Sequence, residues 1–337
     1  MAEARTEPAA AAPSQASGSA SPLDHRLGGW PALAIALALL ALPPLAQALG
    51  GDFYISLATR ILVFALAATS LNLVLGYGGM VSFGHAAFLG LGAYAAALVM
   101  QAGVTTAWVA WPVAMAVAAL AALVIGAICL RTQGVYFIMI TLAFAQMLYF
   151  LMVSLKSLGG DDGMNLAGRP RLPGLGVFAD LADDSRLYYV VLAVCTLGWL
   201  GVWRLVNSRL GHALQAMKEN PTRMAAIGFP VRRYQLAAFV IAAALAGLAG
   251  ALLAAQGNFV SPALMQWHQS GVLMMMVILG GVGRLWGPVV GAVVFLLLEE
   301  ILGHYTMHWQ FFLGAILLAV VLLAPRGLAA LGERRAR

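Results

Sequence analysis

Charged residues are scarce in this 337-residue chain, at 9% of the total, whereas hydrophobic residues make up 62%. The mean hydropathy is correspondingly high, at +0.89. A soluble domain of ordinary composition carries about 25% charged residues, so a soluble fold is excluded. The formal net charge of +6 is scattered among short loops. Because no basic stripe is interleaved with aromatic residues, the charge argues against a nucleic-acid partner. The bilayer is therefore expected to be this chain's solvent.

Cysteine and the common catalytic motifs are also scarce or absent. The two cysteines, Cys129 and Cys195, lie in apolar runs without a CxxC pattern, and they are expected to be packing residues. The sequence contains no HExxH, no GxSxG and no Gly-x-x-x-x-Gly-Lys-Ser/Thr loop. His304 and His308 are spaced i, i+4 but lack a third ligand nearby. We therefore expect no metal, no cofactor and no covalent chemistry.

Long apolar runs dominate what is present. A helix needs about 20 mostly apolar residues to cross a bilayer. The sequence predicts ten spans near residues 29–49, 54–75, 81–100, 107–130, 134–153, 187–206, 234–256, 270–282, 288–303 and 305–324. The eighth and ninth are short and are predicted to be a broken pair. The predicted fold class is thus an all-α polytopic membrane protein with about ten transmembrane helices, some of them short or discontinuous.

The chain divides into a tail, a transmembrane domain and a second tail. Residues 1–28 are rich in Ala, Ser and Pro and are predicted to be a disordered cytoplasmic tail. The transmembrane domain covers 29–325, with an outer (periplasmic) loop at 154–186 and a cytoplasmic loop at 203–233. A basic cytoplasmic tail follows at 326–337. The first apolar run begins late and is long enough to span, so it is expected to remain uncleaved.

Basic residues divide unequally between the two faces that this model defines. If the amino terminus is cytoplasmic, the inner face holds Arg5, Arg26, Arg131, Arg204, Arg209, Lys218, Arg223, Arg232, Arg233, Arg284, Arg326, Arg334, Arg335 and Arg337. The outer face keeps Arg60, Lys156, Arg169, Arg171 and Arg186. Basic loops stay in the cytoplasm, so both termini are predicted there. A single helix over 270–303 would instead place Arg284 in mid-membrane, which is costly.

Loop 203–233 is a polar, basic island between apolar runs. It carries six of the basic residues against one acid, Glu219. HALQAMKEN, residues 212–220, has helical propensity, and a second short element is predicted over 225–228, after Pro221. The island is interpreted as a docking loop for a partner, with an ordinary solvated loop as the alternative.

Two glycine-rich segments, 75–94 and 279–292, interrupt the apolar runs. Both begin Leu-Gly and resume as a helix, a pattern typical of discontinuous helices in transporters. Close packing of helices through small residues is the alternative reading. Candidate pathway residues in and beside these segments are Asn72, Gly76, Gly78, Gly79, Ser82, His85, Gly280, Gly281 and Gly283.

Ten segments of the sequence, taken together, resemble the motifs of a known family. They are NLVLGYGG (72–79), SFGHAAF (82–88), GAY (92–94), GVYF (134–137), TLA (141–143), GGDDG (159–163), the basic island, AGLAGA (246–251), LGG (279–281) and GPV (287–289). Over residues 55–325 the chain resembles the permeases of branched-chain amino-acid ABC importers, of the LivM type. It departs from the family pattern at Pro221 and at Arg284.

The resemblance implies a bacterial inner-membrane subunit without an ATPase site of its own. Its implied partners are a second permease subunit, cytoplasmic ATP-binding subunits, a periplasmic substrate-binding protein and membrane lipid. The implied contact with the ATPase lies in a coupling helix within the basic island, with candidate residues Arg209, Gly211, Lys218, Glu219, Asn220, Ala225, Ala226 and Gly228. Pro221 should end the first short helix and alter this contact.

Three functions remain open at this stage. The preferred one is import of branched-chain or related amino acids. The second is import of urea, short amides or other small polar solutes, which similar permeases with the same architecture carry. The third is an ion-coupled secondary transporter, which needs an intramembrane carboxylate pair. Only Glu299 and Glu300 approach one, near the end of a span.

Overall fold

The computed structural model describes residues 39–44, 51–166, 168–174, 176, 180–324 and 327–329. Besides helical residues 39–44, nine apolar helices of at least 14 residues occur in these ranges: α2 (Asp52–Asn72), α3 (His85–Gln101), α4 (Ala107–Cys129), α5 (Val135–Ser154), α6 (Asp184–Val206), α9 (Val231–Gly257), α10 (Trp267–Gly280), α11 (Gly287–Tyr305) and α12 (Trp309–Leu323). Six of the described helices are long and apolar enough to cross a membrane, and α3, α10 and α12 are shorter. The all-α polytopic fold is confirmed.

Each predicted span overlaps helical residues of the structure, although several of the predicted bounds differ from the observed ones. Residues 39–44 of the first predicted span are helical, whereas the predicted tail 1–28 lies outside the described residues. The third span is predicted from residue 81 but begins at His85, because residues 78–84 form a turn. The predicted break between the eighth and ninth spans is confirmed, since α10 ends at Gly280 and α11 begins at Gly287.

Short elements connect the apolar helices. They are the π-helix η1 (Leu73–Tyr77), the 3-10 helices η2 (Lys156–Leu158), η3 (Gly160–Asp162) and η5 (Pro262–Met265), the helices α7 (Arg209–Glu219) and α8 (Pro221–Ala226), and the strands β1 (Met164–Asn165) and β2 (Phe259–Val260). The two strands pair antiparallel, with Met164 opposite Val260. Strands and 3-10 helices thus lie in the loops, and the membrane domain itself is helical.

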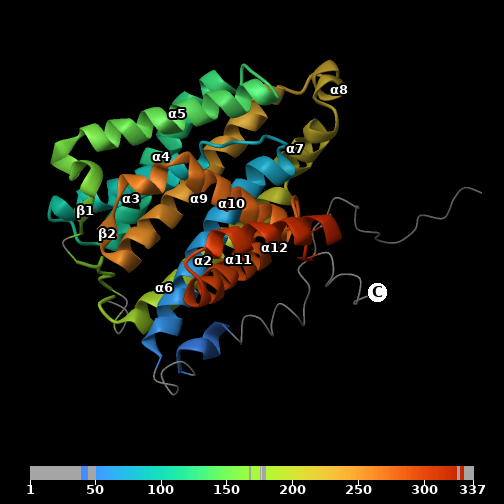
Figure 1. Cartoon of the computed structure of the whole chain (residues 1–337). Helices are drawn as coiled ribbons and strands as arrows, with labels where there is room; N and C mark the ends of the chain where they lie inside the picture. Colours follow the sequence, from blue (N-terminus) through green and yellow to red (C-terminus); the bar gives the residue numbers. More distant parts are fainter. Residues whose placement is uncertain are drawn as a thin grey trace, which may run out of the picture.

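Helix α9 is the centre of the bundle, and α2, α3 and α4 pack against it (Figure 1). Small residues make this packing possible. A side chain at Gly92 of α3 would overlap the backbone of Gly247 in α9, and one at Gly250 would overlap the Leu89 carbonyl. Helices in lipid associate through such close backbone approaches, because burying apolar surface yields little there.

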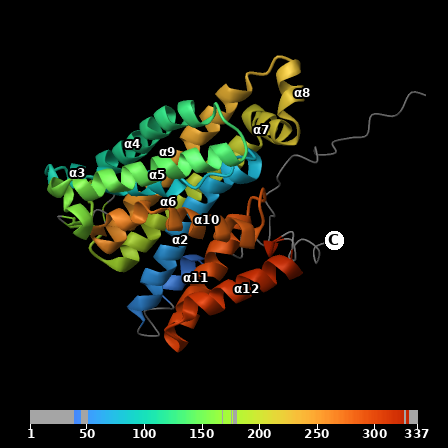
Figure 2. The ribbon, with the colours of Figure 1, turned by 45° about the horizontal axis from the view of Figure 1, so that its top comes forward.

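The remaining helices flank this centre on different sides. Helix α5 lies on one side of the bundle, whereas α11 packs beside α2 on the other side and α12 lies beyond α11 (Figure 2). Helices α10 and α11 pack closely as a hairpin, since a side chain at Gly291 would overlap the Met276 carbonyl. Backbone of Leu328 returns to this hairpin and donates to the Leu279 carbonyl at 3.0 Å.

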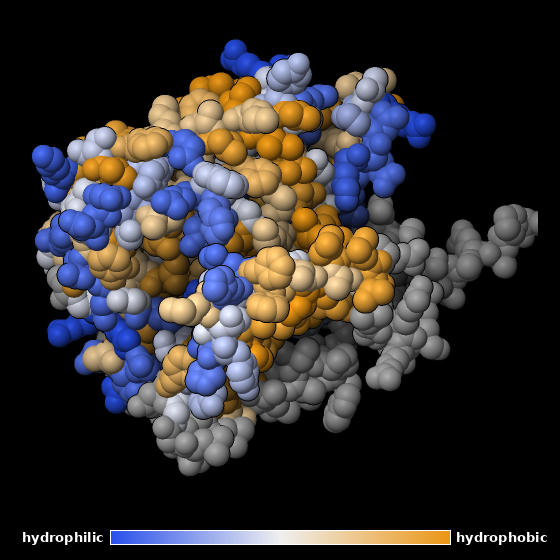
Figure 3. All heavy atoms as spheres, in the orientation of Figure 1, coloured by the Kyte–Doolittle hydropathy of each residue, from blue (hydrophilic) through white to orange (hydrophobic). Residues whose placement is uncertain are grey.

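Polar surface gathers at two ends of the molecule. Hydrophilic residues cover the end that holds β1 and β2 and the region of α8, whereas α12 presents hydrophobic residues (Figure 3). Helices α7 and α8 stand out from the bundle at the end away from β1 and β2 (Figures 1 and 2). A bundle with an apolar flank between polar ends is the surface expected of a membrane-spanning domain.

Candidate functional site

The two glycine-rich segments meet in the folded chain. Asn72, the last residue of α2, spans the backbone of the α10–α11 turn with its carboxamide. Its Oδ1 accepts from the N–H of Gly283 at 2.9 Å, and its Nδ2 donates to the carbonyl of Arg284 at 3.0 Å. The Asn72 side chain is buried, and a buried backbone group without a partner is costly. One side chain therefore satisfies two backbone groups of the second segment.

Gly76 provides the space for this meeting. A Cβ at Gly76 would lie 2.6 Å from the Gly283 nitrogen and 2.8 Å from its Cα. Real Cβ atoms do not approach backbone this closely, so the two segments touch only because position 76 lacks a side chain. Gly283 has φ +76°, a left-handed conformation that favours glycine. The contact between Gly76 and Gly283 is thus a close approach of two backbone segments, as the alternative reading of the glycines describes.

Lys218, from the basic island, also contacts the first glycine segment where it meets the second. Its Nζ donates to the Gly76 carbonyl at 2.8 Å, and its side chain passes over Gly79, where a Cβ would lie 2.9 Å from Lys218 Cγ. We call the five residues Asn72, Gly76, Lys218, Gly283 and Arg284 the glycine junction. It connects three parts of the chain: the end of α2, the end of α7 and the α10–α11 turn.

The helix break at the junction explains why these groups need partners. Helix α2 continues into the π-helix η1, and π-helical turns are frequent at functional sites. The Gly78 N–H donates back to the Leu73 carbonyl at 3.1 Å, and the chain then turns away before α3. Carbonyls at such a helix end carry partial negative charge, which the ammonium of Lys218 complements.

Helix α6 supports the α10–α11 turn from another side. The Trp199 indole N–H donates to the Leu285 carbonyl at 3.3 Å, and its ring lies 4.4 Å from that of Trp286, centroid to centroid. Tryptophan combines a large apolar surface with one donor, which suits it to hold backbone in place. Sequence reasoning missed this pair, although both tryptophans are visible in apolar runs.

A cavity of about 340 Å³ opens beside the junction. It lies between the first glycine segment, the α4–α5 loop, α7 and the start of α8 and α9. Its lining residues are Gly78, Gly79, Met80, Val81, Leu130, Thr132, Gln133, Gly134, Phe137, Ile138, Met217, Lys218, Pro221 and Gln235. Gly79 and Gly134 have φ of +67° and +62° at its rim. Of the candidate pathway residues, Gly78 and Gly79 border this space.

Ser82 and His85 are placed differently, in the core. Both are fully buried. His85 Nε2 lies 2.8 Å from Ser70 Oγ of α2, and Ser82 Oγ accepts from the Gly84 N–H at 3.3 Å. These bonds tie the turn after η1 to its neighbours, so the described contacts of both residues are structural.

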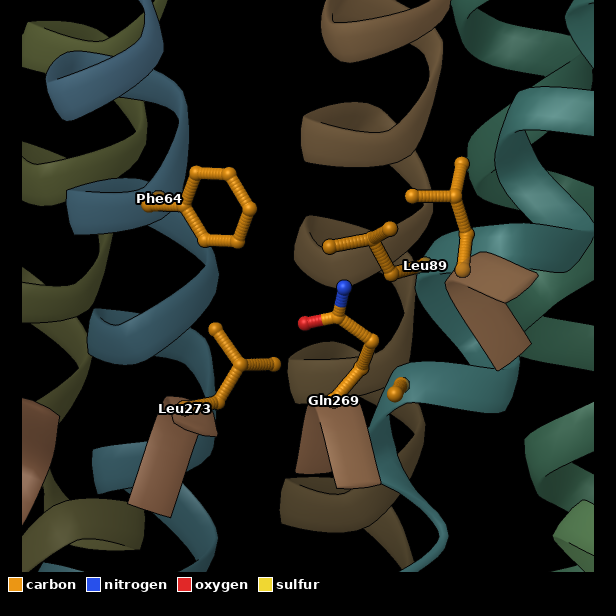
Figure 4. Close-up of a pocket in the computed structure, with 6 residues that line it drawn as sticks. Phe64, Leu89, Gln269 and Leu273 are labelled. Atoms are coloured by element: carbon orange, nitrogen blue, oxygen red, sulfur yellow. The ribbon is translucent and has the colours of Figure 1, made fainter. Parts of the chain in front are cut away.

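A second cavity, near the start of α3, is small. A cavity of about 10 Å³ lies between α2, α3 and α10, and the Gln269 carboxamide points into it between Phe64, Leu89 and Leu273 (Figure 4). Such a volume holds about one water molecule. An amino acid does not fit there.

Gly280 and Gly281 pack within the α10–α11 hairpin. A Cβ at Gly280 would overlap the Gly287 carbonyl, and Gly281 has φ +120°. The cavity lining does not include either residue. The candidate pathway residues therefore separate into the junction, the cavity rim, the core and this hairpin.

The coupling candidates lie in and beside two short helices, but the second helix covers Pro221–Ala226 and not the predicted residues 225–228, because Pro221 begins this helix. Arg209 begins α7 and Glu219 ends it. Asn220 then caps α8, because its Oδ1 accepts from the Arg223 N–H at 2.9 Å, and Pro221 occupies the first position of α8. Gly211 is packed, since a Cβ there would overlap the Val206 carbonyl.

The end of α8 is an exposed surface with apolar residues. Ala225 and Ala226 close the helix and are exposed, and Ile227 and Phe229 beyond them are 64% and 38% exposed. Gly228 between them has φ +89° and nothing within 4 Å of its Cβ position. Exposed apolar residues within a basic loop are typical of an interaction surface.

Carboxylates and possible metal ligands are placed as follows. Glu299 of α11 accepts from Arg60 of α2 at 3.1 Å, an ion pair that uses the carboxylate structurally. The described residues contain no group of three or more His, Cys, Asp or Glu that could hold a metal ion. Glu299, one of the two carboxylates that the ion-coupled alternative would use, is thus paired with a cation.

Comparisons with known proteins agree on one family. Residues 53–321 match the family model described as "Branched-chain amino acid transport system / permease component". The high-affinity branched-chain amino acid transport system permease protein LivM of Escherichia coli is 29% identical over 294 residues, covering 81% of this chain and 69% of the relative. LivM of Salmonella typhimurium gives the same figures.

A relative with a different cargo in its name also matches. The autoinducer 2 import system permease protein LsrC of Klebsiella pneumoniae is 31% identical over 150 residues, covering 40% of this chain and 44% of the relative. No solved structure matches significantly.

Proposed function

Since the chain belongs to the family of permease components of branched-chain amino acid transport systems, we propose that it is one of two permease subunits of an ATP-driven importer. The cargo is a branched-chain or related amino acid, as in the LivM relatives that share 29% identity with it. The membrane is the bacterial inner membrane. This chain supplies the passage, and other subunits supply the energy.

The observation that carries the proposal is the arrangement of α7 and α8. They stand out from the bundle, carry an exposed apolar end at Ile227 and Phe229, and are basic around it. At the same time Lys218 of α7 reaches into the bundle and bonds Gly76. A loop that offers a surface outward and a contact inward is suited to pass a partner's movement to the helices.

The partners follow from the family and from the sequence. Cytoplasmic ATP-binding subunits would dock on α7 and α8, a second permease would complete the passage, and a periplasmic binding protein would deliver cargo. The sequence contains no nucleotide-binding loop, so hydrolysis is assigned to the docked subunits. ATP-dependent closure of those subunits would bias the permease pair between inward-open and outward-open states.

The orientation is part of the proposal. The end with α7, α8 and the α10–α11 turn faces the cytoplasm, and the end with β1 and β2 faces outward. Basic residues support this, because segment 203–233, which includes α7 and α8, carries six and the 154–186 loop carries four. Cysteines introduced at Arg223 and Asp183, with Cys129 and Cys195 replaced, should report it. An impermeant thiol reagent should label position 183 in intact cells and position 223 only after permeabilisation. The reverse pattern would overturn the orientation.

Uptake by the reconstituted complex tests the function. Proteoliposomes that contain both permeases, the ATP-binding subunits and the binding protein should accumulate leucine when ATP is supplied on the side of the ATP-binding subunits. A protonophore and a sodium ionophore should leave uptake unchanged. Uptake that collapses with either ionophore would favour the ion-coupled alternative.

The cargo is tested in the same vesicles. Leucine, isoleucine and valine should be imported in preference to urea and acetamide. If urea or a short amide is imported instead, the assignment as an ATP-driven importer holds but the assignment of an amino-acid cargo is wrong. The LsrC relative, named for autoinducer 2 import, motivates this comparison, since its name assigns a cargo of another class to a related sequence.

A further inference from the structure

We infer that Lys218 is a positioning residue of the transport cycle: its bond to the Gly76 carbonyl transmits the movement of α7 to both broken helices at the glycine junction. The inference rests on the proposed function, because it assumes that α7 and α8 are moved by ATP-binding subunits. It goes beyond the proposed function by naming the side chain that transmits this movement from α7 to the membrane helices.

The first step is the contact itself. Lys218 lies in the last turn of α7, directly before the exposed helix α8. Its Nζ donates to the Gly76 carbonyl at 2.8 Å across 142 positions of sequence. The stem of the side chain lies over Gly79, where even a methyl group would approach Cγ to 2.9 Å. The first glycine segment therefore contacts the stem of Lys218 and also accepts the hydrogen bond from its ammonium group.

The second step is what Gly76 touches. The Gly283 Cβ position lies 3.2 Å from the Gly76 carbonyl oxygen and 3.9 Å from Lys218 Nζ. Gly283 is in turn held by Asn72 Oδ1 at 2.9 Å, so the first and second glycine segments are fixed to each other. A displacement of Lys218 thus acts on the end of α2 and on the α10–α11 turn together.

The third step is the nature of the bond. An ammonium is a compact charge with three donors on a flexible stem, and it bonds a helix-end carbonyl without a covalent or hydrophobic attachment. Such a bond can break and form again within a cycle. The places it holds are helix interruptions, η1 and residues 281–286, where a helix changes direction most easily.

The chain offers a matched control for this lysine. Its only two lysines are Lys156 and Lys218. Lys156 lies in η2, is exposed, and belongs to the 154–186 loop at the opposite end. The substitutions K218M and K156M each remove one ammonium and keep a stem of similar length. K218R restores a donor that can reach the Gly76 carbonyl.

ATP hydrolysis and leucine uptake, measured in the same proteoliposomes of the full complex, test the inference. In K218M we expect the ratio of leucine imported to ATP hydrolysed to fall about tenfold, because a charge-assisted bond to backbone is lost while the ATP-binding subunits remain intact. K156M should keep the parental ratio, and K218R should recover most of it.

A second pair of variants acts on the lysine without changing it. Gly79→Ala places a methyl group against Lys218 Cγ, whereas Gly103→Ala, at φ +87°, meets nothing within 4 Å. Both impose a side chain on a left-handed glycine, so the strain is shared and only the contact differs. The ratio should fall for Gly79→Ala alone.

The outcomes test the role of Lys218 separately from the proposed importer function. An unchanged ratio in both K218M and Gly79→Ala overturns the inference while ATP-driven uptake by the parent keeps the proposed function. An equal fall of uptake and hydrolysis in K218M also overturns it, since Lys218 would then only stabilise the complex. If the parental complex shows no ATP-driven uptake, the proposed function itself fails.

Discussion

The two glycine-rich segments look alike in sequence and differ in structure. The first, residues 75–94, contains a turn whose Gly78 and Gly79 border a cavity of about 340 Å³. The second, residues 279–292, is a tight hairpin in which Gly280 and Gly291 meet backbone of the facing helix. One is partly open and the other is closely packed.

The comparison shows that a high glycine content predicts a helix break but does not predict the role of that break. The role depends on the residues that surround the break. Residues 78–81 line a cavity together with α7 and the α4–α5 loop, whereas a Cβ at residue 280 or 291 would overlap a backbone carbonyl. Packing glycines should therefore be intolerant of any side chain, and cavity glycines should transmit their effects through particular neighbours such as Lys218.

The largest effect is expected from breaking the second segment. Gly291→Leu forces a side chain into the Met276 carbonyl, while Gly303→Leu in the same helix α11 meets nothing within 4 Å. Overpacking against rigid backbone costs about 1–3 kcal/mol or more, so Gly291→Leu should prevent stable assembly. The yield of monodisperse complex in detergent measures this, and equal yields for the two variants would contradict the packing assignment.

A smaller loss should follow when the two segments are separated. Asn72→Ala leaves the Gly283 N–H and the Arg284 carbonyl without their side-chain partner. Each unsatisfied buried group costs about 1–3 kcal/mol, so the thermal midpoint of the complex should fall. Asn165→Ala, at an exposed position in β1, should leave the midpoint near its parental value. A midpoint unaffected by Asn72→Ala would mean that the carboxamide does not join the segments.

The turn after α8 sharpens the comparison, because Gly228 has a left-handed φ of +89° but no close neighbour. Gly228→Val should cost about 1–3 kcal/mol of local strain and misplace the end of α8, whereas Gly228→Asn accepts this conformation. Substrate-stimulated hydrolysis by the reconstituted complex should therefore fall for the valine variant and persist for the asparagine variant. Unchanged stimulation in both would move the docking surface elsewhere.

The smallest effect is expected at Arg60 and Glu299, between α2 and α11. Their side chains are 41% and 23% exposed, so the pair should couple by about 0.2–1 kcal/mol. A double-mutant cycle with Arg60→Met and Glu299→Gln measures this coupling through thermal stability. Glu299→Gln should also retain uptake, and its complete loss would indicate that Glu299 carries protons or ions.

The sequence predicted the helices better than the contacts between them. Nine of the ten predicted spans correspond to described helices, because long apolar runs leave few alternatives in a bilayer. The start of the third span was placed too early, at residue 81 instead of His85. The reason is that Met80 and Val81 are apolar but belong to the turn.

The glycine junction could not be predicted, although its members Asn72, Gly76, Gly283 and Lys218 stand out individually. It joins residues 142 and 211 positions apart, and hydrophobic periodicity carries no information on such pairings. The contacts of Ser82 and His85 could not be predicted either. Their polarity within an apolar run suggested the pathway, whereas the structure places them in the buried core with hydrogen bonds to Gly84 and Ser70.

Photo-crosslinking of α8 is the most direct test of the central claim that α7 and α8 connect this chain to an ATPase. A photoreactive residue at Arg223, which is exposed in α8, should capture an ATP-binding subunit in the assembled complex, and the same residue at Lys156 should not. Capture of an ATP-binding subunit from position 156, or none from position 223, would contradict the account.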